Sequence, residues 1–201
     1  MTDDCLNIVV VGVGGQGIIL VSRIVGEASL NSNLNAMVSE IHGMAQRGGK
    51  VISTIRIGDA HSPMIGSGEA DIILGLEPIE TYRYLGFASE KTTIITSTNQ
   101  VFPFTVTAGK EEYPDLNELF ADIKKVGKKF VKLDIEKITK KNGLPVIVGN
   151  MIMLGALSGA CPEVPISPEK FKETIKQNVP LRFAEVNLKA FDIGFKEANT
   201  N

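Results

Sequence analysis

A run of chemically capable side chains stands out in the first quarter of the chain. Residues 40–49 read Glu-Ile-His-Gly-Met-Ala-Gln-Arg-Gly-Gly, which brings a carboxylate, an imidazole, an amide and a guanidinium close together. The two glycines at its end interrupt regular structure and let the backbone approach a ligand or another chain closely. Functional side chains are common on such loops. We therefore predict that residues 40–49 form a loop that contacts a ligand or a partner.

The side chains of this loop suit different roles. Arg47, flanked by Gln46 and by Gly48-Gly49, suits a pair of carboxylate or phosphate oxygens. His42 is interpreted as a polar group beside a reacting or ligand-binding centre, with a capped loop histidine as the alternative. Glu40 can instead pair with Arg47 and fix the loop. A loop with a purely architectural role remains the competing interpretation.

A second glycine-rich loop lies upstream and follows an apolar, β-branched run. Residues 12–17 read Gly-Val-Gly-Gly-Gln-Gly, which matches the dinucleotide-binding fingerprint in its strand–loop–helix setting. Glycines at these positions would let amides at a helix N-terminus face a phosphate. The residues available for such binding are Gly12, Gly14, Gly15, Gln16 and Gly17.

The fingerprint leaves NAD or FAD binding open as an alternative. Glu40 follows the second expected strand, 23 residues after Gly17, where an acidic residue would hold the ribose hydroxyls. However, Gly15 and Gln16 depart from the usual pattern, and a tight turn from strand to helix needs small residues for packing alone. We therefore favour grouping Glu40 with the other polar residues of the 40–49 loop.

Composition narrows the class of protein. The chain has 201 residues, 43% of them hydrophobic and 22% charged, which suits one globular domain. A net charge of -2 argues against broad binding to nucleic acid or an anionic membrane. Two cysteines, Cys5 and Cys161, cannot provide the four thiolates of an iron–sulfur cluster or a structural zinc. Free thiols and an acidic start without a signal peptide indicate a cytoplasmic protein.

Strand patterns alternate with helix patterns along most of the chain, which predicts an α/β, Rossmann-like layered fold with a mostly parallel sheet and helices on both faces. We expect a C-terminal helical region over about 150–201. Strands are expected at residues 6–11, 36–39, 51–57, 71–75, 92–97 and 130–133. Helices are expected at 18–29, from 78 to about 85, 116–126, 135–142 and 150–160, from 168 onward, and at the C-terminus.

Local signals fix several helix ends. Asp115 and Asp134 are expected N-caps, Gly143 is an expected stop, and Pro168 suits a first helical turn. On the last helix, an apolar stripe at heptad-like spacing is expected to be core rather than interface. Its members are Leu181, Ala184, Leu188, Phe191 and Phe195.

Together, the two loops resemble a known family. Residues 12–18 and 40–49 are similar to segments of the gamma subunits or domains of 2-oxoacid:ferredoxin oxidoreductases. The His-Gly-Met-Ala-Gln-Arg-Gly-Gly form resembles the beta subunits of the indolepyruvate enzymes in particular. The resemblance continues through residues 51–58, 70–77 and 149–157. It covers essentially the whole chain, so residues 1–201 are expected to form a single gamma-type domain.

The resemblance implies a subunit of a heteromeric enzyme. The complex would convert an aryl pyruvate and coenzyme A to the aryl-acetyl-CoA and carbon dioxide while reducing ferredoxin. Thiamine diphosphate, Mg and 4Fe-4S clusters are implied on a large alpha subunit, so this chain would bind no metal and be inactive alone. Amides of residues 14–17 and the Arg47 side chain would help to bind coenzyme A or substrate, with Glu40 and His42 in support.

Three functions therefore compete. The first is this enzyme subunit, or the equivalent subunit of another 2-oxoacid:ferredoxin oxidoreductase, with ferredoxin as an indirect partner. The second is an assembly scaffold in which neither loop touches a ligand. The third is an independent NAD- or FAD-binding oxidoreductase, which would bind its cofactor without any partner chain.

Overall fold

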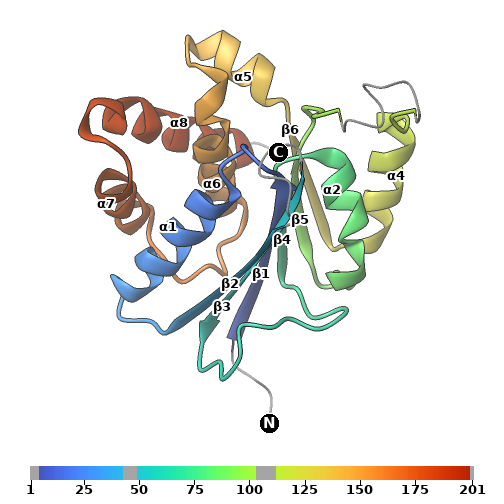
Figure 1. Cartoon of the computed structure of the whole chain (residues 1–201), viewed down its shortest axis with the longest axis horizontal. Helices are drawn as coiled ribbons and strands as arrows, with labels where there is room; N and C mark the ends of the chain where they lie inside the picture. Colours follow the sequence, from blue (N-terminus) through green and yellow to red (C-terminus); the bar gives the residue numbers. More distant parts are fainter. Residues whose placement is uncertain (1–4, 43–48, 103–111, 200–201) are drawn as a thin grey trace.

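Six strands form one sheet at the centre of the molecule (Figure 1). The computed structural model describes residues 5–42, 49–102 and 112–199. The sheet order is β2-β3-β1-β4-β5-β6, and β3 alone among these strands runs against the others. The strands are β1 Cys5–Val13, β2 Ala36–His42, β3 Lys50–Gly58, β4 Ile72–Gly75, β5 Thr93–Ser97 and β6 Lys129–Leu133. The prediction of a mostly parallel α/β sheet is confirmed.

Helices cover both faces of this sheet (Figure 1). One face carries α1 Ile18–Leu30, α6 Gly149–Ala160, α7 Pro168–Asn178 and α8 Leu181–Asn199. The other face carries α2 Pro78–Arg83 and α4 Leu116–Val126, while α5 Ile135–Asn142 lies beyond the end of β6. Short 3-10 helices lie at η1 Leu85–Phe87 and η2 Val146–Val148.

Alternation along β1 explains why both faces need helices. Ile8 and Val10 face the core below α1 and α6, whereas Val9 and Val11 face the core below α4. All four side chains are fully buried. Successive strand residues point to opposite faces, so an unbroken apolar strand can be buried only between two layers.

The expected helix ends agree with the structure. Asp115 accepts hydrogen bonds from the first-turn amides of α4, and Asp134 accepts one from Lys137 in α5. Gly143 ends α5 at φ 63°, the left-handed conformation that glycine adopts without strain. Pro168 occupies the first turn of α7. These ends depend on local chemistry, which is why the sequence predicted them.

The boundary between the second strand and the 40–49 loop was predicted wrongly. Residues 40–42 belong to β2, with Glu40 opposite Ser53 and His42 opposite Val51 in an antiparallel ladder with β3. Their backbone groups pair across the sheet, and this non-local pairing extends the strand past the expected position. The loop itself therefore connects two neighbouring strands of a hairpin.

The apolar stripe on α8 is core only in part. Phe191 is fully buried and Ala184 is buried, but the Leu181 side chain is 91% exposed. Leu181 lies ten residues before Phe191, about 15 Å along the helix, and so projects beyond the helices that cover Phe191. The stripe therefore predicted burial correctly at Phe191, near the contact with α6, and wrongly at Leu181, the first residue of the helix.

Glycines let α6 and α8 approach each other closely. A Cβ atom at Gly155 would overlap the carbonyl oxygen of Phe191, and one at Gly194 would overlap the carbonyl oxygen of Ile152. The two helices therefore touch through their backbones. This contact fixes α6, whose first residues help to line the candidate site described below.

We predict that Gly155→Ala destabilises the protein by about 1–3 kcal/mol, because the added methyl group would force the two helix backbones apart. Urea unfolding followed by circular dichroism measures this change. Gly86→Ala is the matched control, since no atom lies within 4 Å of the position its Cβ would take. A Gly155→Ala variant as stable as the control would contradict the close backbone contact.

Candidate functional site

A cavity of about 260 Å³ lies at the carboxyl ends of the parallel strands. The first glycine-rich loop contributes Gly15 and Gln16 to its wall, and the start of α6 contributes Gly149 and Asn150. Residues after β4 and β5 complete it, among them Val101. Ligands of open α/β sheets bind at this edge, where successive connections leave in opposite directions. Here that point lies between β1 and β4.

Two helices direct uncapped N-termini toward this cavity. Neither α1 nor α6 has an N-cap side chain that accepts a hydrogen bond from its first turn, and neither first turn contains an acidic residue. Within α6, the Asn150 side chain accepts a hydrogen bond from the Met151 amide at 3.0 Å, which leaves the other first-turn amides for a ligand. By contrast, α2, α4, α5 and α7 each have a side-chain cap. Unpaired amides and the positive end of the helix dipole favour an anion. The cavity is therefore suited to a phosphate or a carboxylate.

Gln16 and Gly17 hold the glycine-rich loop in shape. The Gln16 side chain accepts a hydrogen bond from the Val13 amide at 2.8 Å and donates one to the Leu76 carbonyl at 3.0 Å. Gly17 has φ 81°, and a Cβ atom there would overlap the Asn150 side chain. Gln16 thus joins the loop to the chain leaving β4, and Gly17 lets α1 and α6 meet.

The structure brings the ends of the two glycine-rich loops together. The Gly14 amide donates a hydrogen bond to the Gly49 carbonyl at 2.8 Å, directly beyond the β1–β3 ladder. Gly14 is therefore not one of the amides available to a phosphate in this structure. Gln46, Arg47 and Gly48 lie outside the described residues, and the roles of these residues and of His42 stay predictions.

Glu40 lies away from this cavity. It lines a separate depression between α1 and β2, together with Arg23 and Glu27. In a dinucleotide-binding fold the strand carrying the ribose-binding acid is the direct neighbour of the first strand. Here β3 separates β2 from β1. This arrangement argues against Glu40 as a ribose ligand and weakens the dinucleotide interpretation of residues 12–17.

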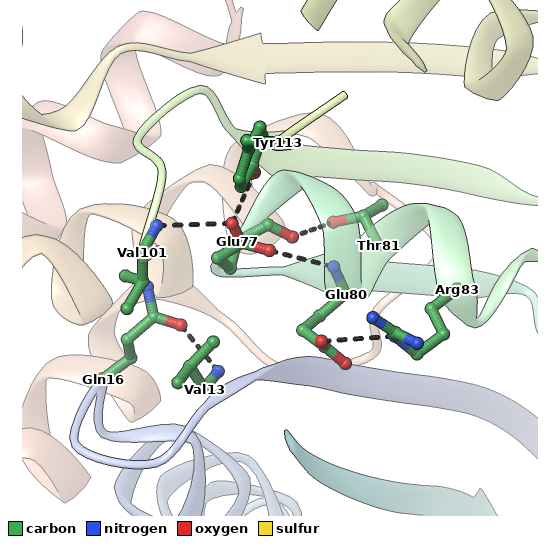
Figure 2. A network of polar contacts seen from close by, with 8 residues as sticks. All are labelled: Val13, Gln16, Glu77, Glu80, Thr81, Arg83, Val101 and Tyr113. Carbon is green, nitrogen blue, oxygen red and sulfur yellow. Dashed lines mark hydrogen bonds and ion pairs between the residues drawn. The ribbon is translucent and has the colours of Figure 1, made fainter. Parts of the chain in front are cut away.

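Glu77 is a site residue that the sequence did not single out (Figure 2). It is 1% exposed and caps α2 by accepting a hydrogen bond from the Glu80 amide at 2.9 Å. Its other oxygen accepts hydrogen bonds from the Val101 amide at 3.3 Å and the Tyr113 hydroxyl at 2.6 Å. The pKa of Tyr113 is raised, mainly by burial and secondly by this hydrogen bond to Glu77, so the hydroxyl remains protonated and acts as the donor.

The Glu77 carboxylate therefore fixes one wall of the cavity. Val101 lines the cavity, and Glu77 ties it to the start of α2. The available signal was an acidic residue directly after a buried strand and before Pro78. That signal predicts a helix cap, but the contacts with Val101 and Tyr113 depend on residues more than twenty positions away.

Glu80 is a second buried glutamate with a different environment (Figure 2). One carboxyl oxygen lies 3.3 Å from Arg83, while the other, Oε2, is buried without a hydrogen-bond partner. Burial raises the pKa of Glu80, although Arg83 opposes the change. The protonated form is therefore favoured relative to an exposed glutamate.

Three further properties of the described residues bear on the function: thiol reactivity, metal binding and membrane spanning. Burial raises the pKa of Cys161 to about 12, which keeps this thiol protonated and unreactive. No group of three or more histidine, cysteine, aspartate or glutamate residues in the described chain could hold a metal ion. Within the same residues, no helix is both long and apolar enough to cross a membrane.

Comparisons with known proteins place this chain in a family. The model of the pyruvate ferredoxin/flavodoxin oxidoreductase family matches residues 7–197. The chain belongs to this family. The resemblance to this family seen in the sequence is therefore confirmed.

Similar proteins within the family are oxidoreductase subunits. The indolepyruvate oxidoreductase subunit IorB of Methanothermobacter thermautotrophicus is 42% identical over 96% of this chain and 97% of that protein. The IorB subunit of Archaeoglobus fulgidus is 39% identical over 96% and 95%, respectively. The keto/oxoacid ferredoxin oxidoreductase gamma subunit of Geobacter sulfurreducens has a similar structure, with a TM-score of 0.72 and 26% identity over 98% of this chain and 99% of that one.

We predict that Glu77→Gln destabilises the protein by about 1.5–3 kcal/mol, the usual range for hydrogen bonds to a charged group. The amide would turn a donor toward groups that themselves donate. Urea unfolding followed by circular dichroism gives the free energy. Unchanged stability would show that the buried carboxylate does not hold the Val101 segment.

Whereas Glu77→Gln should destabilise the protein, we expect Glu80→Gln to stabilise it relative to the wild type as the pH rises. A carboxyl whose pKa is higher in the folded state binds more protons when folded, so its contribution to stability falls as pH rises. Removing the charge should therefore make the variant increasingly more stable than the wild type between about pH 4 and pH 7. Melting temperatures across this range measure the difference. Exposed Glu90→Gln serves as the control, and a difference that shrinks with pH would contradict the account.

Proposed function

We propose that this chain is the small, beta-type subunit of a heteromeric indolepyruvate:ferredoxin oxidoreductase. The complex would oxidatively decarboxylate aryl pyruvates to aryl-acetyl-CoA and pass the two electrons released to ferredoxin. The observation that carries this proposal is the 39–42% identity to indolepyruvate oxidoreductase subunits along nearly the full length of both chains. Residues 1–201 would act as one gamma-type domain in the cytoplasm.

The proposal assigns the redox cofactors to a larger alpha subunit. Two cysteines, Cys5 and Cys161, cannot supply four thiolates to a 4Fe-4S cluster, and Cys161 is buried and protonated. Thiamine diphosphate, Mg and the clusters would therefore be bound by the partner, which also passes electrons to ferredoxin. Thiamine diphosphate would supply the carbanion chemistry of decarboxylation. This chain would be inactive alone.

The cavity at the glycine-rich loop would contribute to the coenzyme A site. Uncapped amides at the starts of α1 and α6 suit a phosphate or the substrate carboxylate. Ile147 lines the same cavity and is 83% exposed, so the rim offers an apolar surface to the partner subunit or to the ligand. Arg47 would add a charge-assisted contact, with His42 in support, whereas Glu40 lines a separate depression and is not part of this cavity. These side chains bind and orient, and the cofactor carries the chemistry.

Three alternatives remain distinguishable from this proposal. The chain would be a subunit for another 2-oxoacid if the substrate pocket belongs mainly to the partner. The gamma subunit with a similar structure is named for a keto/oxoacid enzyme, which keeps this alternative open. It would be an assembly scaffold if the cavity touches no ligand. The dinucleotide interpretation is the least favoured, because β3 lies between Glu40 and the glycine-rich loop.

Co-expression with an alpha-type large subunit, followed by anaerobic purification, tests the proposal. Ferredoxin or dye reduction that requires indolepyruvate, coenzyme A, thiamine diphosphate and both chains would support it. A complex active only on another 2-oxoacid would change the substrate and keep the subunit role. NAD or FAD binding by this chain alone, without any complex, would overturn it.

We predict that Asn150→Asp raises the KM for coenzyme A about tenfold in the assembled enzyme, equivalent to about 1.4 kcal/mol. The substitution preserves side-chain size and places a negative charge in the first turn of α6, beside the proposed anion site. A carboxylate there stabilises the helix, so folding should not suffer. Steady-state kinetics at varied coenzyme A measure the effect.

Asn117→Asp provides the control, because it makes the same change in the first turn of α4, on the opposite face of the sheet. Its KM for coenzyme A should equal that of the wild type. If Asn150→Asp also leaves the KM unchanged, the cavity does not bind the phosphate groups, and the scaffold alternative gains support.

A further inference from the structure

Strand β2 lies at one edge of the sheet with its outer side open. Among the strands that the structure describes, it pairs with β3 alone. Natural edge strands commonly carry lysine, proline or a bulge that prevents pairing with another chain. β2 reads Ala-Met-Val-Ser-Glu-Ile-His and has neither lysine nor proline. This edge is therefore competent to extend the sheet.

Two hydrogen bonds establish which backbone groups of β2 point outward. The Gly58 amide donates to the Asn35 carbonyl at 2.9 Å, and the Ser53 hydroxyl donates to the Ser39 carbonyl at 3.0 Å. The backbone groups of odd-numbered residues near these positions thus face β3. Because an antiparallel strand alternates between inward and outward pairs, those of Ala36, Val38, Glu40 and His42 face away from the sheet.

The side chains of β2 are also divided between two faces. Val38 and Glu40 lie on the α1 side, where they line the depression that also contains Arg23. Met37, Ser39 and Ile41 therefore lie on the opposite side. Met37 is 37% exposed and Ile41 is 57% exposed. The strand thus presents an apolar residue on each side of a central serine.

We propose that β2 pairs with β2 of a second copy of this chain, antiparallel, about a two-fold axis at Ser39. In this register Val38 lies opposite Glu40 of the second copy, and Ala36 lies opposite its His42. All four outward-facing residues of each strand then exchange backbone hydrogen bonds in the closely spaced pattern of an antiparallel ladder. The two six-stranded sheets become one continuous sheet.

The side chains make this register self-complementary. Met37 lies opposite Ile41 of the second copy at both ends, and the two Ser39 hydroxyls meet at the centre. Cross-strand apolar pairs and paired hydroxyls each stabilise a sheet by roughly 0.2–1 kcal/mol. Glu40 faces Val38 of the second copy, so equal charges do not oppose each other. An isologous interface requires this kind of match between a surface and itself.

The two neighbouring two-fold registers fit less well. With the axis at Glu40, the Glu40 residues of the two copies would lie opposite each other, and equal charges destabilise a sheet. With the axis at Val38, Met37 would lie opposite Ser39 of the second copy, and Ile41 would lie opposite Asn35, outside the strand. Both exposed apolar side chains would then lose their apolar partners. The sequence around Ser39 therefore favours a second copy of this chain as the partner, and it favours the register with the axis at Ser39. The β2 edge lies on the other side of β1 from β4, away from the candidate site. The inference therefore does not depend on the proposed function.

Cysteine cross-linking of the full-length chain tests the register. Ser39→Cys should form a disulfide-linked dimer under mild oxidation, because residues at the axis face each other in a pair without backbone hydrogen bonds, with Cα atoms about 4.5 Å apart. Val38→Cys is the matched control, since two such residues would lie beyond the roughly 7 Å limit for a disulfide. Cross-linking through Val38→Cys but not Ser39→Cys would overturn the proposed register.

Charge exchange tests the interface without oxidation. The wild-type chain should have the mass of a dimer in sedimentation experiments. The double variant Met37→Lys/Ile41→Lys and the double variant Met37→Glu/Ile41→Glu should each be monomeric, because equal charges would face each other. An equimolar mixture should restore the dimer. Because both side chains are exposed, each variant should remain folded, with the same circular dichroism spectrum as the wild type.

Three results would overturn the proposal. The first is a wild-type chain that remains monomeric at every concentration reached. The second is a pair of double variants that stay dimeric. The third is a complex in which the large subunit occupies β2, so that the lysine variant loses that subunit while the wild-type complex contains one copy of this chain. The mass of the co-expressed complex distinguishes this last case.

Discussion

The antiparallel pairing of β3 with β1 determines where the rest of the molecule places its functional groups. It brings Gly49 against Gly14, so the ends of both glycine-rich loops meet at the carboxyl edge of β1. It also moves β2 to the edge of the sheet and separates Glu40 from the first loop. A fold that begins like a dinucleotide-binding domain thereby loses the neighbouring acidic strand that such domains use.

The cavity that remains is suited to assisting a partner rather than to independent catalysis. Its described walls combine uncapped helix N-termini, neutral polar side chains, one glutamate (Glu136) and an exposed apolar rim. The side chains of Glu77 and Gln16 form hydrogen bonds with other parts of the protein, and these bonds fix the walls of the cavity in the absence of a ligand. Under the proposed function, a preformed anion site with an apolar rim is what a small subunit would contribute to a larger partner that holds the redox cofactors.

Local chemistry made much of the fold predictable, and non-local pairing accounts for the failures. Asp115, Asp134 and Gly143 act within a few residues of themselves, so their roles could be predicted from the sequence. The extension of β2 through Glu40 depends on β3, and the burial of the α8 stripe depends on where α6 crosses it. Within the site, the turn at residues 14–17 was predictable, but Gly12 and Val13 belong to β1 because they pair with β3. The contacts of Glu77 with Val101 and Tyr113 likewise join segments that only the folded chain brings together.

Hydrogen–deuterium exchange on the assembled two-subunit enzyme, with and without coenzyme A, tests the central claim most directly. If the cavity binds the phosphate groups, amides at the starts of α1 and α6 should exchange more slowly when coenzyme A is present. Amides of α4, on the other face of the sheet, should not change. Protection confined to the large subunit, with no change at α1 or α6, would contradict the account and leave this chain as a scaffold.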